Sequence, residues 1–235
     1  MRTEFHVHTR KSHDSFMGRY ALLAMCRARK IDCVGVTDHN EVSGALAIRP
    51  YLEAHGVAVI VGEEIFTSEG EIIGLFLTEK VDPGMTPEET VADIQRQGGV
   101  VYVPHPYDEK RQKTVLSEEA QRRLAKKIDC MEIHNGRNAE TSFSVKQRSI
   151  AEALSIPAII GGDSHCFFEI GRNVCVTDEA FSRETFAKTL TTARFVMATC
   201  HPFAHAATRV VRLIKMIGKG DVSGIHRVLA RKLAR

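Results

Sequence analysis

Short apolar runs alternate with helical patterns along most of the chain. Seven runs, several of them apolar at nearly every position, indicate strands that are buried on both faces. They lie at residues 4–8, 33–37, 57–61, 72–77, 100–103, 130–133 and 158–160. Helical spacing of apolar residues recurs at 19–30, 41–54, 87–97, 117–127, 139–154 and 183–193. This alternation predicts an α/β fold, and specifically a barrel of parallel strands.

Two of the predicted helices have clear start signals. Thr86 is followed by Pro87 and then by Glu89, which is the pattern of a capping box with proline at the first helical position. Ser117 precedes two acids, and an N-cap with negative charges in the first turn favours a helix there.

The last 33 residues depart from this alternation. We expect two amphipathic helices, at 203–217 and 221–234, and expect the apolar stripe of the first to dock on the barrel: Val210, Leu213, Ile214 and Ile217. The chain is therefore divided into a barrel domain at 1–202 and a basic helical extension at 203–235, packed on or beside it.

Composition changes this picture little. A chain of 235 residues suits one compact domain, and no apolar run approaches the roughly 20 residues that span a bilayer. The first residues lack the features of a secretory signal, so a cytoplasmic protein is expected. None of the six cysteines forms a C-x-x-C pair, which favours free, buried thiols.

Charge is distributed unevenly. Residues 203–235 carry eight Lys or Arg against the single acid Asp221, so that this segment has a charge of +7 within a net charge of +3. Such a tail suggests contact with nucleic acid, an anionic membrane surface or a partner protein. A solvent-exposed basic helix face would have the same composition.

Histidines and acids recur where the predicted strands end. The first strand ends in His6-Val7-His8, and alternate residues of a strand share a face. The next loop and the other strand ends supply Asp14, His39, Glu63, Glu64, His105, Glu132, His134, Asp163 and His165. The carboxyl ends of parallel barrel strands meet at one face, where such barrels have their active sites. Six segments are therefore predicted to share one pocket.

This mixed set of side chains indicates a metal site. Imidazoles and carboxylates suit zinc, manganese and iron, and the set exceeds what one ion needs. Two ions about 3.5–4 Å apart can activate water and neutralise phosphoryl oxygens, so hydrolysis of phosphate esters is the predicted chemistry. A strand face takes only one of Glu63 and Glu64. The histidines without a strand-end context are expected to be structural or exposed: His13, His55, His201, His205 and His226.

In this order, the segments resemble the polymerase and histidinol phosphatase (PHP) superfamily of metal-dependent phosphoesterases. The motifs are His6-Val7-His8-Thr9 with Ser12 and Asp14, Thr37-Asp38-His39, Val61-Gly62-Glu63-Glu64, Pro104-His105-Pro106, Glu132-x-x-Asn135 and Gly162-Asp163-Ser164-His165. They extend over about residues 3–175, and only their combination is specific. The resemblance implies a distorted (β/α)7 barrel of the PHP type, here with a C-terminal helical extension.

The resemblance also implies which residues are catalytic metal ligands. One ion would be surrounded by His6, His8, Glu64 and Asp163, and another by Asp14, His39, His105 and His165. In the family the second residue after the glycine bridges the ions, which selects Glu64. Members with three ions have a histidine in the segment that here reads Glu71 to Leu75, where this chain has none. His134 is the candidate replacement, so two or three divalent ions are expected.

A small phosphorylated molecule is the expected substrate, with nucleotides and short nucleic acids among the options. Arg137 and Arg172 each follow a motif and are candidates for binding phosphate, because guanidinium can bind it in a bidentate manner. Surface arginines would look the same in sequence.

Two other functions remain as alternatives. A PHP-fold scaffold or nucleic-acid-associated module with little activity would tend to lose ligands, whereas here eight expected positions are filled. A hydrolase of C–N bonds in a similar barrel would often use a lysine at a strand end, and no predicted core strand ends in lysine.

Overall fold

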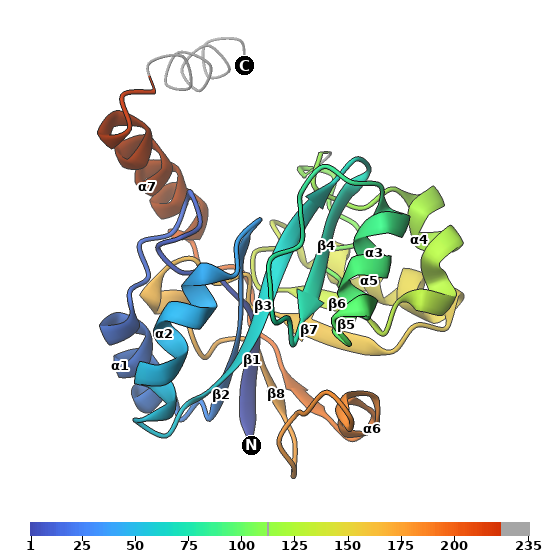
Figure 1. Cartoon of the computed structure of the whole chain (residues 1–235), viewed down its shortest axis with the longest axis horizontal. Coiled ribbons are helices and arrows are strands. Elements are labelled where there is room, and N and C mark those ends of the chain that lie inside the picture. Colours follow the sequence, from blue (N-terminus) through green and yellow to red (C-terminus); the bar gives the residue numbers. More distant parts are fainter. Residues whose placement is uncertain (112, 222–235) are drawn as a thin grey trace.

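A computed structural model describes residues 1–111 and 113–221 of the chain (Figure 1). The strands are β1 (Arg2–Val7), β2 (Cys33–His39), β3 (Ala58–Thr67), β4 (Gly70–Leu75), β5 (Val100–Val103), β6 (Cys130–Asn135), β7 (Ala158–Gly161), β8 (Val174–Val176) and β9 (Arg194–Val196). The α-helices are α1 (Arg19–Arg29), α2 (Ser43–Glu53), α3 (Pro87–Arg96), α4 (Glu118–Leu124), α5 (Thr141–Leu154), α6 (Phe186–Thr191) and α7 (Ala204–Gly218). Two short 3₁₀ helices are η1 (Ala125–Lys127) and η2 (Phe167–Glu169).

Strands β1 to β7 form a nearly closed barrel, which confirms the predicted fold class. They follow one another in space in chain order. The segment after β7 closes the ring on β1: the Ser164 N–H donates to His6 O, and the His8 N–H donates to Ser164 O, both at 2.9 Å. Strands β8 and β9 extend the sheet outward from β1 as an antiparallel ribbon, which the sequence pattern did not predict.

Strand β4 runs against the direction of its neighbours. It pairs antiparallel with both β3 and β5, whereas the other barrel pairs are parallel. The parallel barrel predicted from the apolar runs therefore has one reversed strand. A hairpin with only two residues between its strands, Ser68 and Glu69, joins β3 to β4, and too few residues lie there for the crossover that a parallel pair needs. As a result, β4 begins at the barrel end where the other six strands finish.

Helices cover the outside of the barrel, as Figure 1 shows for α1 and α2 on one side and α3, α4 and α5 on the other. Each presents buried residues at helical spacing, such as Leu22 and Cys26 of α1 or Ile48 and Leu52 of α2. Together with the strand residues they form one continuous apolar core. Because this core fixes the strands from both sides, side chains at the strand ends are held in a rigid frame.

The capping box predicted for α3 is confirmed. The Glu89 N–H donates to Thr86 Oγ1 at 3.3 Å, and the Thr86 N–H donates to Glu89 Oε2 at 2.9 Å. Thr86→Ala is expected to lower the free energy of unfolding by about 1 kcal/mol, whereas Thr86→Ser keeps the acceptor and should stay near the wild type. Urea unfolding followed by circular dichroism measures both. Equal losses in the two variants would contradict the role of the cap.

Helix α7 begins and ends within one residue of its prediction and projects from the barrel (Figure 1). Of its apolar stripe, Val210, Ile214 and Ile217 are each at least half exposed, and only Leu213 is partly buried, so most of the stripe does not dock as expected. The helix is attached instead through Lys215, whose Nζ donates to Arg10 O at 2.7 Å and to the carbonyl oxygens of Ser12 and Ser15 at 2.6 Å. The second predicted helix lies almost entirely outside the described residues.

The remaining predictions from composition concern cysteines and membranes. All six cysteines are free; Cys26, Cys33, Cys130 and Cys175 are buried, whereas Cys166 and Cys200 are half-buried. Within residues 1–111 and 113–221, no helix has the length and apolar character needed to cross a bilayer.

Candidate metal centre

The side chains predicted to bind metal lie at one end of the barrel. His6 and His8 come from the end of β1, His39 and Glu64 from β2 and β3, and Asp14 from the loop after β1. His105 follows β5, and Asp163 and His165 follow β7. All are buried except His39, whose side chain is 17% exposed. The predicted convergence of the strand ends is therefore present in the structure.

Four of these residues form a first group. His6 Nε2 lies 3.2 Å from Glu64 Oε1, and His8 Nε2 lies 3.5 Å from Glu64 Oε2. Asp163 Oδ1 is 3.8 Å from His6 Nε2 and 3.6 Å from His8 Nε2. This is the set that the resemblance assigns to one ion.

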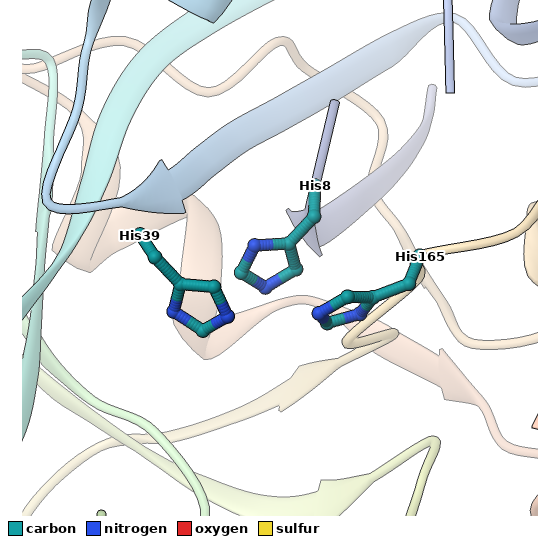
Figure 2. Close-up of side chains that lie close together, drawn as sticks. All are labelled: His8, His39 and His165. Atoms are coloured by element: carbon teal, nitrogen blue, oxygen red, sulfur yellow. The ribbon is translucent and has the colours of Figure 1, made fainter. Parts of the chain in front are cut away.

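A second group lies beside the first. Asp14 Oδ1 is 3.2 Å from His165 Nε2 and 3.6 Å from His39 Nε2. The imidazoles of His8, His39 and His165 face one another (Figure 2), and the rings of His8 and His165 are stacked with centroids 4.0 Å apart. His105 does not join this group as the resemblance implied; its Nε2 lies 3.1 Å from Glu64 Oε1, on the side of His6.

Several donor atoms in these groups are buried without a hydrogen-bond partner, among them His6 Nε2, His8 Nε2 and Asp14 Oδ1. Most of the distances above exceed those of hydrogen bonds. They match the roughly 3–3.6 Å that separates ligand atoms around an ion with bonds of about 2.0–2.2 Å. A buried polar atom without a partner destabilises the fold, so the residues present fit a shared set of divalent cations.

The pKa values of the candidate ligands are shifted in different directions by their surroundings. Burial disfavours charge on His6 and His39, but the nearby carboxylates, first Glu64, outweigh it and raise the pKa of both imidazoles well above the usual value. Burial and the neighbouring His165 and His39 lower the pKa of His8 well below it. Burial opposes ionisation of Glu64, yet His6 and His39 hold its pKa low. The surroundings of His8 therefore favour its neutral form, the form of imidazole that binds metal.

Glu132 orients two of the histidines, a role the sequence did not reveal. Its Oε1 lies 2.7 Å from His6 Nδ1 and accepts a hydrogen bond from the Tyr102 hydroxyl. Its Oε2 accepts from the His105 N–H at 2.7 Å and from Asn135 Nδ2 at 2.8 Å. A carboxylate that holds one ring nitrogen of a histidine turns the other nitrogen toward the metal.

Asp38 plays the corresponding role for the loop after β1. Its carboxylate accepts hydrogen bonds from the backbone and hydroxyl of both Thr9 and Ser12, at 2.6 to 3.1 Å. The Ser12 hydroxyl in turn lies 3.1 Å from His8 Nδ1. The family motifs contain these residues, but their function in shaping the loop follows only from the structure.

Three of the predicted ligands have a left-handed backbone conformation. The φ angles are 64° at His6, 27° at His105 and 50° at Asp163. This conformation is unfavourable for residues with a side chain, and such strain is concentrated at functional sites. At His6 it accompanies a register shift in the pairing of β1 with β2.

Three sequence-predicted residues are not brought to the groups. His134 is hydrogen-bonded through Nδ1 to Ser144 Oγ at 2.7 Å, and its Nε2 lies 3.1 Å from Asn173 Oδ1 and from Ala198 O. Because both ring nitrogens are occupied, it does not replace the missing family histidine in this structure.

The two arginine candidates also point elsewhere. Arg137 is buried and makes a bidentate ion pair with Glu169 at 2.8 Å. Arg172 donates to Thr199 O at 3.0 Å. Neither guanidinium contacts the candidate metal ligands among the described residues.

Three residues near the site were not among the predicted ligands. The Nη2 of Arg111 lies 2.7 Å from Asp163 Oδ2, and its Nε lies 3.1 Å from Asp108 Oδ2. Exposed His13 lies at the rim, 3.7 Å from Asp14. Glu71 is buried beside His39 and His105, and burial together with Glu64 raises its pKa well above the usual value.

Comparison with known proteins agrees with this fold. No family model matches the chain. Over 117 residues the chain is 38% identical to the uncharacterized protein MJ1587 of Methanocaldococcus jannaschii. This match covers 46% of this chain and 68% of the relative. It is structurally similar to a two-domain protein from Bacteroides vulgatus that contains a predicted PHP-like metal-dependent phosphoesterase, with a TM-score of 0.64 and 15% identity. That match covers 84% of this chain and 64% of the other, less than two thirds of its length.

The chain is also similar to the solved structure of an amidohydrolase from Chromobacterium violaceum with bound sulfate and no metal. The TM-score is 0.57 at 14% identity, over 87% of this chain and 95% of the other. Identities this low show the fold alone. The chain thus belongs to the same family as MJ1587 and has the fold of the PHP-like metal-dependent phosphoesterases.

Proposed function

We propose that this protein is a metal-dependent hydrolase of phosphate esters. The observation that supports this best is the convergence of buried imidazoles and carboxylates from six chain segments, with donor atoms that lack other partners. Keeping them together without a cation is costly, because buried polar groups need partners. A scaffold without activity has no use for such an arrangement.

Each group of ligands would hold one ion, with Glu64 between them. His6, His8 and Asp163 face the first position, and Asp14, His39 and His165 face the second. Divalent ions bound there would lower the pKa of water and neutralise charge that develops on a phosphoryl group. Glu132 and Asp38 would keep the ligands oriented while the ions exchange.

Arg111 is the cation best placed to orient the substrate. Its guanidinium uses part of its donors on Asp163 and Asp108, and its side chain is 22% exposed. Because arginine has five donors in a planar arrangement, the remaining ones can bind an anionic oxygen beside the ions. A small phosphate ester, such as a nucleotide or short nucleic acid, would suit this position.

Hydrolysis of a C–N bond is the second candidate, because the chain shares its fold with the Chromobacterium amidohydrolase. None of the seven described barrel strands contains a lysine, and enzymes of that type often use one at a strand end. Phosphate esters are therefore favoured.

The test is a substrate panel on protein first stripped of metal and then loaded with Mn²⁺ or Zn²⁺. We expect hydrolysis of p-nitrophenyl phosphate or nucleotides, and not of lactams or amides, only in loaded protein. His39→Ala should lower kcat/KM by about a hundredfold, because it would weaken binding of an ion that supplies electrostatic stabilisation of the transition state. The matched control is His55→Ala, because His55 is exposed and, among the described residues, its imidazole hydrogen-bonds only to Tyr51 O.

Three outcomes would contradict the proposal. Undiminished hydrolysis in His39→Ala would remove the cluster from the chemistry. Turnover of amides alone would favour the second candidate. Absence of both metal and turnover would favour a scaffold.

A further inference from the structure

Glu71 occupies an unexpected place in the barrel. It is the second residue of β4, and because β4 is reversed, the start of this strand lies at the end where the other strands finish. Across the hairpin Glu64 pairs with Ile73 and Phe66 pairs with Glu71, so that Glu64 and Glu71 lie on the same face. Glu71 is only 6% exposed.

The Glu71 carboxylate faces two imidazoles without hydrogen-bonding to either. Its Oε1 is 3.8 Å from His39 Nδ1, and its Oε2 is 3.6 Å from His105 Nε2. The same two nitrogens lie 2.9 Å and 3.1 Å from Glu64. Among the described residues, none donates a hydrogen bond to the Glu71 carboxylate. Two buried carboxylates thus share two imidazoles, and donor atoms of His39, Glu64 and Glu71 lie within 4.8 Å of one another.

We propose that Glu71 is a metal ligand that, with Glu64 and His105, forms a further cation subsite beside His39, whose Nε2 faces the second position. This inference rests on the proposed metal centre and adds to it. A cation there would offset the repulsion between the Glu64 and Glu71 carboxylates. The described residues around Glu71 donate no hydrogen bond to its carboxylate that could do so instead. Family members with three ions have a histidine ligand in this segment. In this chain Glu71 would take the place of that histidine, so that His134 is not needed as a ligand.

The ligand chemistry indicates which ion the subsite favours. Carboxylates suit manganese and magnesium, whereas imidazoles suit zinc, iron and copper. A subsite with two carboxylates and one imidazole is therefore expected to prefer manganese to zinc more than the other two positions do, since each of those has at least two imidazoles. Glu71→His should shift that preference toward zinc.

The experiment measures bound metal instead of turnover. Metal-free wild type, Glu71→Gln, Glu71→His and Glu63→Gln are incubated with equal Mn²⁺ and Zn²⁺, passed over a desalting column and analysed for both elements. Glu63 is the matched control, because it is buried next to Glu64 but accepts its hydrogen bond from the Val81 N–H, away from the imidazoles. Thermal unfolding of each metal-free variant shows whether it is folded.

We expect Glu71→Gln to retain about one ion fewer per chain than the wild type, and Glu71→His to recover it with a higher share of zinc. Glu63→Gln should match the wild type. The inference is overturned if folded Glu71→Gln and Glu71→His both bind the wild-type number of ions in the wild-type ratio. If the wild type itself binds no ion, the proposed metal centre fails, and the two failures are thereby distinguished.

Discussion

Glu64→Gln is expected to lower kcat/KM for a phosphate ester by about a thousandfold or more, the upper range for losing electrostatic stabilisation of a transition state, because Glu64 would hold the ions that supply it. Glu64 is the residue that every group shares, because its two oxygens lie within 3.5 Å of ring nitrogens of His6, His8, His39 and His105. The amide keeps the shape of the side chain but removes the negative charge. Bound ions should be lost along with activity. A thousandfold loss of kcat/KM corresponds to about 4 kcal/mol of transition-state stabilisation.

Steady-state kinetics and elemental analysis of the same preparation measure this effect. Glu63→Gln is again the neighbouring control, since the Glu63 side chain points away from the imidazoles. If both variants lose activity equally, the effect belongs to the packing of β3 and not to the charge of Glu64. If Glu64→Gln remains fully active, Glu64 does not lie between catalytic ions.

Glu132→Ala is expected to lower the free energy of unfolding of the metal-free protein by about 3–5 kcal/mol, as when one partner of a buried charge pair is removed. Glu132 is fully buried, and its carboxylate holds His6, Tyr102, the His105 backbone and Asn135. Removing it leaves these groups without an acceptor. Metal affinity should also fall about 10–100-fold, because His6 and His105 lose their orientation.

Urea unfolding and a titration with Mn²⁺ measure the two effects separately. Tyr102→Phe removes only one of the donors and should cost about 1 kcal/mol, the usual net value of a hydrogen bond. An unfolding midpoint of Glu132→Ala equal to that of the wild type would show that the network does not stabilise the fold.

The barrel was predictable because its physical signature is local. Strands buried on both faces are continuous apolar runs, and in a parallel barrel the residues at their ends must meet. This rule predicted that His6, His39, Glu64 and Asp163 lie close together, as they do in the structure. The rule fails for β4, because Glu71 lies at the start of this strand and the hydrophobic pattern does not indicate that the strand is reversed.

The other errors have similar causes. His134 stands at a strand end as expected, but the pairing of β6 with β7 shifts register between Glu132 and His134. Glu132 therefore faces the candidate ligands while His134 bonds to Ser144 of α5. Arg111 lies in a loop, where no periodic pattern in the sequence indicates which way its side chain points. Bulges and loops depend on tertiary contacts, and these are invisible in a hydrophobic pattern.

The contact of Lys215 with the barrel bears on where this protein can be divided. Its ammonium donates to the carbonyl oxygens of Arg10, Ser12 and Ser15, which belong to the same loop as Asp14. Three donors on one nitrogen are thus all used to tie that loop to α7. A fragment ending at residue 202 would keep every side chain of the two ligand groups and lose the cation that fastens the loop carrying one of them.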